Sequence, residues 1–499
     1  MFGRFSVSLA LMCAAAVAAD EYDDPAVRLA RILAEKGAIS KIELSMVESA
    51  DENARVSALA SILQRKGLLN ETEVAQVSTR RDTPPVGAVQ VVPVSAQAAR
   101  APAASPQPPP RRTADIPVTS ETHVPVILYG TLLFNAFYNT APNNIQDVPL
   151  FLSKQGSDPS GGDKNFGMTA RQTRLGLRFN EPNVGGARLS GQFEFDTFGG
   201  KTDLPNGMNM DLFRLRLAYG RLDWRHWAFE AGQDWAVFAP LNPTSYAMYA
   251  IPEFAASGNL WIRQPQLRVE YKTGPSDTSH FLWQMSANDP NVGDYPANLF
   301  SAARQPGVGE RGRMPMMENR FAWTSRVHDR DFTVGVSGVY GRGKNAGLIG
   351  LIEVQQPVDS WGVALDYSLP FTRHFNLTGE AFVGRALGIF SATAGEAVGA
   401  VGTPGGHGVR SQGGWIQAQY NFTRKWQTNL AYGIETPTAS ELLVGSRWRN
   451  QNYMGNLMYR LSNNLTFAWE YRRMLTDYRN QIFANERGDH VNLAVAFMF

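Results

Sequence analysis

The sequence has a single cysteine, Cys13, among its 499 residues. One thiol excludes an intramolecular disulfide framework and any metal site that needs several thiolates. Basic and acidic residues nearly cancel, with 47 Lys and Arg against 45 Asp and Glu, so the chain lacks the basic excess of a nucleic-acid-binding protein. After the N-terminal segment, no apolar run approaches the ~20 residues that a membrane-spanning helix needs.

Residues 1–19 are typical of a secretory signal peptide. Arg4 supplies the positive charge, residues 5–17 form a short apolar stretch, and small residues precede an expected cleavage after Ala19. Cleavage would remove Cys13 and direct the chain out of a bacterial-type cytoplasm. The alternative is a lipoprotein signal that uses Cys13, although Met12 is a poor fit where a small residue is expected.

Residues 20–78 are predicted to form a small helical module with an internal repeat. Residues 29–40 align with residues 59–70, and each unit ends in a Lys-Gly stop. Ser40 and Asn70 follow as N-caps, each with a glutamate three residues later, as in a capping box. The pattern predicts two helical hairpins that pack on each other. A self-contained module and a docking site for peptidoglycan or a periplasmic partner, through residues 22–78, both remain open.

Residues 79–123 are predicted to be a linker, because closely spaced prolines alternate with Ala, Val, Gln and Arg and prevent a packed core. From residue 124 to residue 499 the pattern changes to alternation with a period of two, which is typical of β-strands. Over residues 188–196 the apolar side chains and glycine alternate with polar side chains. Over residues 214–222, the pattern places Leu215, Leu217 and Tyr219 on the face opposite to Arg214 and Arg216.

About sixteen segments show this alternation, and the connections between them are short and long in turn. The segments cover residues 126–138, 169–180, 187–199, 211–223, 225–235, 262–273, 279–288, 316–328, 330–342, 355–370, 373–386, 410–422, 425–436, 446–461, 464–476 and 488–499. Tryptophans fall near the expected strand ends, where aromatic girdles belong: Trp224, Trp227, Trp235, Trp261, Trp415, Trp426 and Trp448. The pattern predicts an all-β fold, a transmembrane antiparallel β-barrel of about 16 strands at residues 124–499.

Four motifs within residues 126–273 then point to a family. They are Arg-Gln-Thr-Arg-Leu-Gly-Leu at 171–177, Leu-Arg-Leu-Ala-Tyr-Gly at 215–220, Gly-Gln-Asp-Trp-Ala-Val-Phe at 232–238 and Arg-Gln-Pro-Gln at 263–266. At these residues the chain resembles Gram-negative outer-membrane porins, most closely the DcaP-like trimeric porins. The helical repeat stands where that family carries a coiled coil.

The resemblance implies a sixteen-stranded barrel that assembles as a homotrimer and passes small anionic solutes. It also implies a location in the cell outer membrane, in contact with lipid and lipopolysaccharide, with the helical module in the periplasm. No cofactor is expected.

The alternation predicts which charged side chains face the water-filled interior of a barrel of this size. The expected pore-lining residues are Arg174, Arg178, Arg214, Arg216, Arg268, Lys272, Arg320, Arg326, Glu194, Asp196, Glu230 and Glu270. A slight basic excess among the inward residues predicts a weak preference for anions. Ion pairs between strands that only stabilise the wall are an equally open interpretation.

The long connection at residues 236–261 is the candidate constriction. It is rich in proline and aromatic residues and carries few charges, with Tyr246, Tyr249, Glu253 and Phe254 as the expected lining residues. In the resembled families this loop folds inward and narrows the pore. The alternative is an ordinary extracellular loop.

The pattern leaves three classes of function to compare. A passive porin for small hydrophilic solutes fits the pattern and the resemblance. A structural envelope anchor would use the barrel only to hold the N-terminal module. An outer-membrane enzyme would need a nucleophile and a positioned base, but the seven histidines are scattered and no Gly-x-Ser-x-Gly elbow occurs. We therefore predict no catalytic residue and no metal site.

Overall fold

The chain is described from a computed structural model that covers residues 25–35, 39–50, 55–66, 124–154, 164–200, 211–273, 279–290, 306–349, 352–392, 396–479 and 485–499. The chain divides into two compact units, Met1–Pro93 and Val94–Phe499. The predicted signal peptide, the linker and the cap at Asn70 lie outside the described residues. No described helix is long and apolar enough to cross a membrane.

The N-terminal unit contains three described helices, α2 (Pro25–Glu35), α3 (Lys41–Glu48) and α4 (Arg55–Arg65). The predicted capping box at Ser40 is confirmed. The Glu43 amide donates to Ser40 Oγ at 3.3 Å, and the Ser40 amide donates to Glu43 Oε2 at 2.7 Å. Leu29, Val47 and Ile62, one from each helix, share the buried core of this unit. The apolar spacing read from the sequence therefore forms a small helical core.

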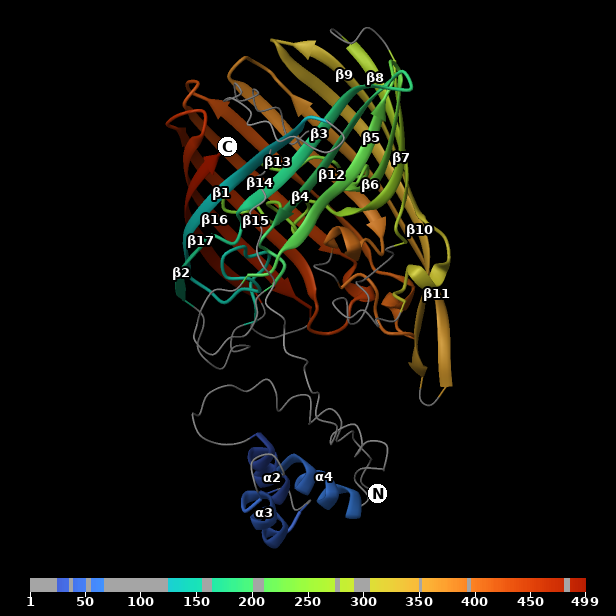
Figure 1. Cartoon of the computed structure of the whole chain (residues 1–499), viewed down its shortest axis with the longest axis vertical. Coiled ribbons are helices and arrows are strands. Elements are labelled where there is room, and N and C mark those ends of the chain that lie inside the picture. The colour runs from blue at the N-terminus through green and yellow to red at the C-terminus, as the bar shows by residue number, and fades with distance from the viewer. Residues whose placement is uncertain are drawn as a thin grey trace. The chain divides into compact units, whose positions relative to one another are not determined.

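The second unit is a closed antiparallel sheet (Figure 1). Its strands are β1 (Val126–Asn139), β2 (Asn165–Thr169), β3 (Arg174–Val184), β4 (Ala187–Asp196), β5 (Arg214–Asp223), β6 (Trp227–Trp235), β7 (Arg263–Lys272), β8 (Ser279–Asn288), β9 (Met316–Val327), β10 (Arg330–Ile349), β11 (Ile352–Leu369), β12 (Phe375–Arg385), β13 (Arg410–Asn421), β14 (Trp426–Pro437), β15 (Arg447–Arg460), β16 (Leu465–Tyr478) and β17 (Asn485–Met498). From β3 onward each strand pairs with the next in the chain, and β17 pairs with β1. This last pairing closes the barrel.

Two of the seventeen strands share one position in the barrel wall. β2 pairs with residues 135–139 of β1, and β3 pairs with residues 126–131 of the same strand. The wall therefore has sixteen positions, and the predicted sixteen-stranded barrel is confirmed. The break between β2 and β3, at residues 170–173, frees Arg171 and Gln172 from the sheet.

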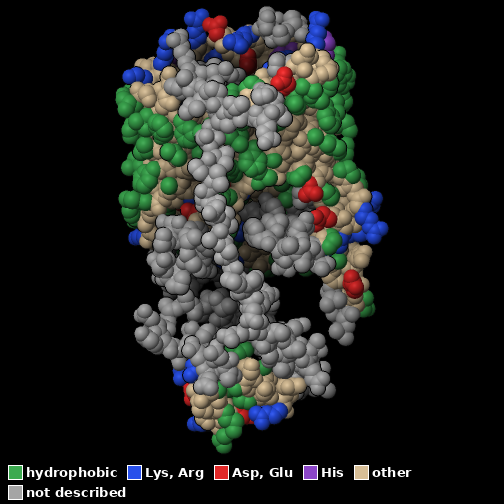
Figure 2. Space-filling model, viewed as in Figure 1, with side chains coloured by type: hydrophobic (Ala, Val, Ile, Leu, Met, Phe, Trp, Pro, Cys, Tyr) green, Lys and Arg blue, Asp and Glu red, His purple; other side chains and the backbone are tan. Residues whose placement is uncertain are grey.

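The outer face of the barrel is apolar. Figure 2 shows a band of hydrophobic side chains around the visible face, with charged groups gathered at its edges. Exposed large side chains of this band include Leu132, Phe134, Phe193, Leu267, Phe281, Phe321, Val363, Leu430, Trp469 and Leu493. Such a band is what lipid chains require of a barrel wall.

The girdle prediction is right for some tryptophans and wrong for Trp415. Trp224, Trp227 and Trp426 are exposed beside the short turns. Trp415 is buried in the middle of β13, and its Nε1 donates to Glu380 Oε2. Its position along the strand puts it on the inner face, because neighbouring side chains of a strand point to opposite sides.

The hairpin of β10 and β11 is longer than predicted (Figure 1). β9 pairs with β10 only as far as Tyr340, and β12 pairs with β11 only from Trp361. Among the described strands, residues 341–349 therefore pair only with residues 352–360. Asn345 Nδ2 donates to the carbonyl oxygens of Gly399 and Gly406 and ties this extension to the next long loop. The glycines and proline of the extension resemble turn signals, which explains why the predicted strands ended too early.

The cap at Ser40 makes α3 sensitive to acid. The bond from the Ser40 amide, helped by Lys66 at 2.9 Å, lowers the pKa of Glu43 from 4.5 to about 2. A carboxylate whose pKa is lower in the folded state stabilises the fold above its unfolded pKa, and this contribution is lost as the pH falls toward the folded value. We expect protection of α3 amides from hydrogen exchange to decline between about pH 4.5 and pH 2. The Glu43→Gln variant should lack this decline; an identical decline would contradict the assignment.

Candidate functional site: the barrel interior and its inward loop

A first group of charged side chains lies on the inner face of β3, β4 and β5. Arg216 Nε donates to Glu194 Oε1 at 2.6 Å, and its Nη1 donates to Asp196 Oδ2 at 3.0 Å. Arg214 pairs with Asp196 at 2.6 Å, and Arg174 lies 3.6 Å from Glu194. The structure thus brings five of the predicted pore-lining residues into one network, in which two carboxylates are shared by three guanidinium groups.

A second group lies on β6 and β7. Arg268 Nη1 lies 3.5 Å from Glu230, 3.3 Å from Asp234 and 3.6 Å from Glu270. Arg221 on β5 joins the group through Glu270 at 2.7 Å and Glu230 at 3.2 Å. Farther along the wall, Arg320 on β9 pairs with Asp366 on β11 at 2.6 Å. Charges on adjacent strands, and on strands one position further apart, therefore neutralise one another over much of the wall.

Three of the predicted residues stand apart from these networks. Arg178 lies over the ring of Tyr129, with 5.2 Å between the guanidinium carbon and the ring centroid. Lys272 is the last residue of β7. Arg326 is exposed near the turn between β9 and β10, where it pairs with Asp331 at 3.4 Å.

A β-bulge in β5 corrects one part of the predicted alternation. Glu194 pairs with Leu217 while Phe195 pairs with Leu215, so Arg216 is an extra residue on β5. Beyond the bulge the faces exchange: Leu217 is buried and the Tyr219 hydroxyl donates to Gln192. The prediction that Leu217 and Tyr219 lie on the face opposite to Arg214 and Arg216 is therefore wrong. The same exchange turns Arg221 toward the interior, which strict alternation did not predict.

The loop at residues 236–261 runs along the inner wall. The amides of Val237 and Phe238 donate to Glu318 Oε2 on β9, at 2.6 and 3.0 Å. The Leu241 amide donates to Glu380 Oε1 on β12 at 2.6 Å, and the Thr244 amide donates to Gln417 on β13 at 2.8 Å. The first half of the loop therefore follows the wall from β9 to β13.

The second half of the loop contacts other strands. Gln172 Oε1 accepts hydrogen bonds from the amides of Tyr249 and Ala250, both at 2.9 Å. Arg174 and Arg214 donate to the carbonyl oxygens of the same two residues, at 2.9 and 2.8 Å. Glu253 then pairs with Arg472 on β16 at 2.9 Å. Side chains from many strands thus fix one loop conformation.

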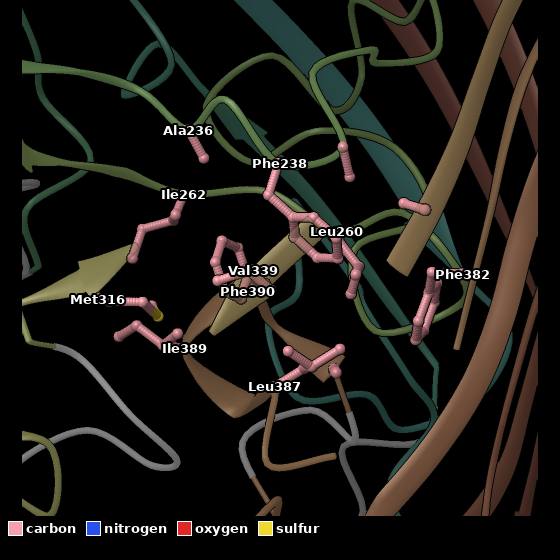
Figure 3. Close-up of a cluster of buried hydrophobic side chains, with 13 residues drawn as sticks. Ala236, Phe238, Leu260, Ile262, Met316, Val339, Phe382, Leu387, Ile389 and Phe390 are labelled. Carbon is pink, nitrogen blue, oxygen red and sulfur yellow. The ribbon is translucent and has the colours of Figure 1, made fainter. Parts of the chain in front are cut away.

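Apolar packing holds the start and the end of the loop (Figure 3). Phe238, Leu260 and Ile262 belong to one buried cluster with residues from the wall and from residues 387–392. The rings of Phe238 and Phe390 pack edge to face, with 5.3 Å between their centroids. A second long loop therefore packs against the first.

The four predicted constriction residues differ in their access to water. Tyr246, Glu253 and Phe254 are buried, whereas Tyr249 is partly exposed. Arg174 stacks on the Tyr249 ring, with 4.0 Å between the guanidinium carbon and the ring centroid. Tyr249 is thus the one of the four that presents side-chain surface to the interior.

Glycines in the wall and in the loop allow the two to approach closely. A Cβ on Gly433 of β14 would lie 2.5 Å from the Ser257 carbonyl oxygen and 2.6 Å from the Phe254 ring. Gly258 has a φ of 106°, and a Cβ there would lie 2.2 Å from the Gly414 carbonyl oxygen. The loop therefore touches the wall backbone, a contact that no larger residue allows.

In three ion pairs of the wall the arginine is the more exposed partner, whereas Arg216 is as buried as Glu194 and Arg268 is less exposed than Glu270. The exposed side-chain fractions are 16% for Arg174 against 2% for Glu194, and 24% for Arg214 against 1% for Asp196. Arg221 is 21% exposed against 3% for Glu230. Pairing reduces the net charge of the wall, and in these three pairs most of the side-chain surface that stays exposed belongs to the arginines. Among the described residues, no group of three or more His, Cys, Asp or Glu side chains is placed to hold a metal ion.

No family model and no curated protein sequence matches the chain. Among solved structures, the crystal structure of the outer membrane channel DcaP of Acinetobacter baumannii has a TM-score of 0.57 and 19% identity, over 77% of this chain and 99% of that chain. OprB of Pseudomonas putida has a TM-score of 0.47 and 11% identity, over 75% of this chain and 94% of that chain. An anion-selective porin from Comamonas acidovorans has a TM-score of 0.45 and 14% identity, over 75% and 99%.

The likeness to DcaP shows the fold. The barrel has the fold of an outer-membrane channel, and the predicted structural resemblance to DcaP is confirmed.

A substitution at Arg216 tests whether the ion pairs stabilise the wall. Its replacement by Met leaves two buried carboxylates short of a partner, and breaking such a pair costs about 3 kcal/mol or more. Arg188→Met is the matched control, because Arg188 is exposed and pairs with Asp223 at 3.2 Å, a kind of pair worth about 0–1 kcal/mol. Urea unfolding in lipid vesicles measures both free energies. Equal losses would contradict the role given to Arg216.

A substitution at Gly433 tests whether the loop depends on its close contact with the wall. Gly433→Val should displace the Phe254 ring and the Ser257 backbone, change the single-channel conductance and expose the loop to proteolysis. Gly220→Val is the control, because a Cβ on Gly220 meets nothing within 4 Å. Unchanged conductance and proteolysis in a folded Gly433→Val barrel would show that the loop does not depend on this contact.

Proposed function

We propose that the protein is a porin of the cell outer membrane, through which small hydrophilic solutes diffuse passively with a weak preference for anions. The channel fold supports the general class of function. The observation that carries the proposed preference is the exposure of Arg174, Arg214 and Arg221 in ion pairs whose carboxylates are buried. An ion in the interior would meet positive charge first.

The preference is weak for a physical reason. Each guanidinium has a carboxylate within 4 Å, and the field of such a pair falls off faster than that of a single charge. Strong selectivity would need unpaired charge at the narrowest point. Residues 236–261 also limit the size of the solutes that pass. Their contacts with the wall fix how much of the interior they occupy.

We propose the following domain organisation for the whole chain. Residues 1–19 act as a signal peptide, residues 20–78 form a periplasmic module, and residues 79–123 link that module to the barrel. The proposed assembly is a homotrimer in contact with lipid and lipopolysaccharide, without a cofactor or a catalytic role. Anchoring of the envelope by the module is compatible with transport, because the module is a compact unit with its own core.

Reversal potentials across a planar bilayer test the anion preference. Under a KCl gradient the wild type should favour chloride. A unit charge at ~4 Å in water changes the energy of an ion by about 1 kcal/mol, so Arg174→Gln with Arg214→Gln should lower the chloride-to-potassium permeability ratio severalfold. Arg373→Gln is the control, because Arg373 is exposed in the short turn before β12. A wild type that favours potassium would overturn the charge assignment.

A further inference from the structure

The outer face of β16 changes from apolar to charged before the strand reaches the long loops. Trp469 and Tyr471 are exposed in the apolar band, and alternation places Arg473 next in the same row, about 7 Å farther along the strand. β16 runs parallel to β6, which leads into the loop at residues 236–261, so β16 ends at the rim that carries the long loops. The apolar band of β16 therefore ends at Arg473, on the side of this rim.

Two further arginines lie on the same face and closer to the rim. Arg487 of β17 is in register with Leu475 of β16, and Arg449 of β15 is in register with Asp477 of β16. Asp477 lies between the two arginines, with Oδ1 at 2.9 Å from Arg487 Nη1 and Oδ2 at 2.6 Å from Arg449 Nη2. We call Arg449, Arg473 and Arg487 the outer arginine patch.

The patch exposes its cations and covers its anions. Arg473 pairs with Asp489 of β17 at 2.8 Å, and the exposed side-chain fractions are 44% and 22%. Asp477 is completely buried, whereas 37% of the Arg449 side chain and 32% of the Arg487 side chain are exposed. Three arginines thus pair with two aspartates, which leaves one net positive charge. A negatively charged group at this face would meet guanidinium N–H groups first.

The level of the patch in the membrane decides what it meets. Tyr432 and Tyr453 lie in register with Arg473 across β14 and β15, and their rings are 4.7 Å apart. Aromatic residues on the outer face of a barrel mark the boundary between hydrocarbon and headgroups, and the long loops lie on the extracellular side. The patch therefore lies among the headgroups of the outer leaflet, where the lipid is lipopolysaccharide.

The apolar surface below the patch fits the other part of such a lipid. Leu457 and Leu493 flank Trp469 on the neighbouring strands, and all three side chains are exposed. Lipid A, the membrane anchor of lipopolysaccharide, carries phosphate groups above several acyl chains. Guanidinium groups bind phosphate through two parallel N–H bonds, which are stronger than bonds between neutral groups. Charge and apolar surface thus occur in the same order on the protein and on the lipid.

We propose that the outer arginine patch binds the phosphate groups of lipid A, while the acyl chains lie along Leu457, Trp469 and Leu493. The two aspartates hold the guanidinium groups in place, and N–H groups on the exposed side donate to the phosphate oxygens. The inference rests on the outer-membrane location within the proposed function. It does not depend on conduction through the interior, because the patch is on the outer face.

Photochemical capture of lipid A by the detergent-purified full chain tests the site. The photoreactive residue p-benzoylphenylalanine replaces Leu457, which lies opposite Trp469 in the apolar surface. The otherwise unchanged chain should capture lipid A with both of its phosphates. Dephosphorylated lipid A has the same acyl chains and should be captured about a hundredfold less, since each arginine near an anionic headgroup contributes roughly fivefold. Equal capture of the two lipids would overturn the inference.

A double variant tests the charge of the patch. Arg473→Gln with Arg487→Gln leaves each aspartate one partner, the Tyr471 hydroxyl at 2.7 Å and Arg449 at 2.6 Å. Its affinity for lipid A should fall about 25-fold. Arg473→Lys with Arg487→Lys keeps the charge and should keep most of the binding. Unchanged capture by the folded glutamine variant would contradict the assignment, and if that variant fails to fold, the comparison of the two lipids decides alone.

Arg373→Gln is the matched control, because Arg373 is exposed in the short turn before β12, at the opposite rim of the barrel. This variant should capture lipid A as the wild type does. Inorganic phosphate at the same concentration should not compete, since it lacks acyl chains; effective competition would overturn the choice of a lipid. Loss of oligomers in the glutamine variant with unchanged capture would assign the patch to a contact between copies of the chain, against the proposal.

Conductance separates this site from the proposed channel. The glutamine variant should conduct as the wild type does in a bilayer without lipid A, because its substitutions lie outside the interior. A protein that captures lipid A and never conducts would refute the channel and keep the lipid site. A protein that conducts but does not distinguish the two forms of lipid A would keep the channel and refute the lipid site.

Discussion

The pairing of β1 with β17 is the constraint on which the rest of the structure depends. Within a lipid bilayer an open sheet edge would leave backbone amides and carbonyls without partners, so a sheet can cross only as a closed barrel. Closure then gives every strand one row of side chains toward lipid and one toward the interior. The apolar band of Figure 2 and the charged inner wall both follow from this single pairing.

The inner wall satisfies its buried charges in two ways. Where strands carry opposite charges side by side, as with Arg216 and Glu194, the wall pairs them directly. Where no cation is available, as at Glu318, the loop supplies backbone amides instead. The loop therefore belongs to the hydrogen-bond network of the wall.

Two interpretations of the inward charges that were alternatives at the level of sequence are compatible in three dimensions. The ion pairs link neighbouring strands, which stabilises the wall. Within the same pairs Arg174 and Arg214 are the exposed partners and Glu194 and Asp196 are buried. One arrangement can thus serve stability and solute preference together. The bond between the two side chains stabilises the wall, and the exposed surface of the arginine is what a solute would meet.

The sequence by itself determined the sixteen positions of the wall, most of the strand bounds and the cap at Ser40, because alternation and capping are local patterns, but it predicted one strand at 169–180 where the structure has β2 and β3 with a break between them. The strand at residues 279–288 was predicted with the bounds that the structure has. Only the tertiary structure decided the bulge at Arg216, the inward position of Trp415 and the length of β10 and β11, since each depends on a neighbouring strand or loop. The contact of Phe238 with Glu318 spans 80 residues of sequence. No local pattern contains such a contact, because only the closed barrel brings its two ends together.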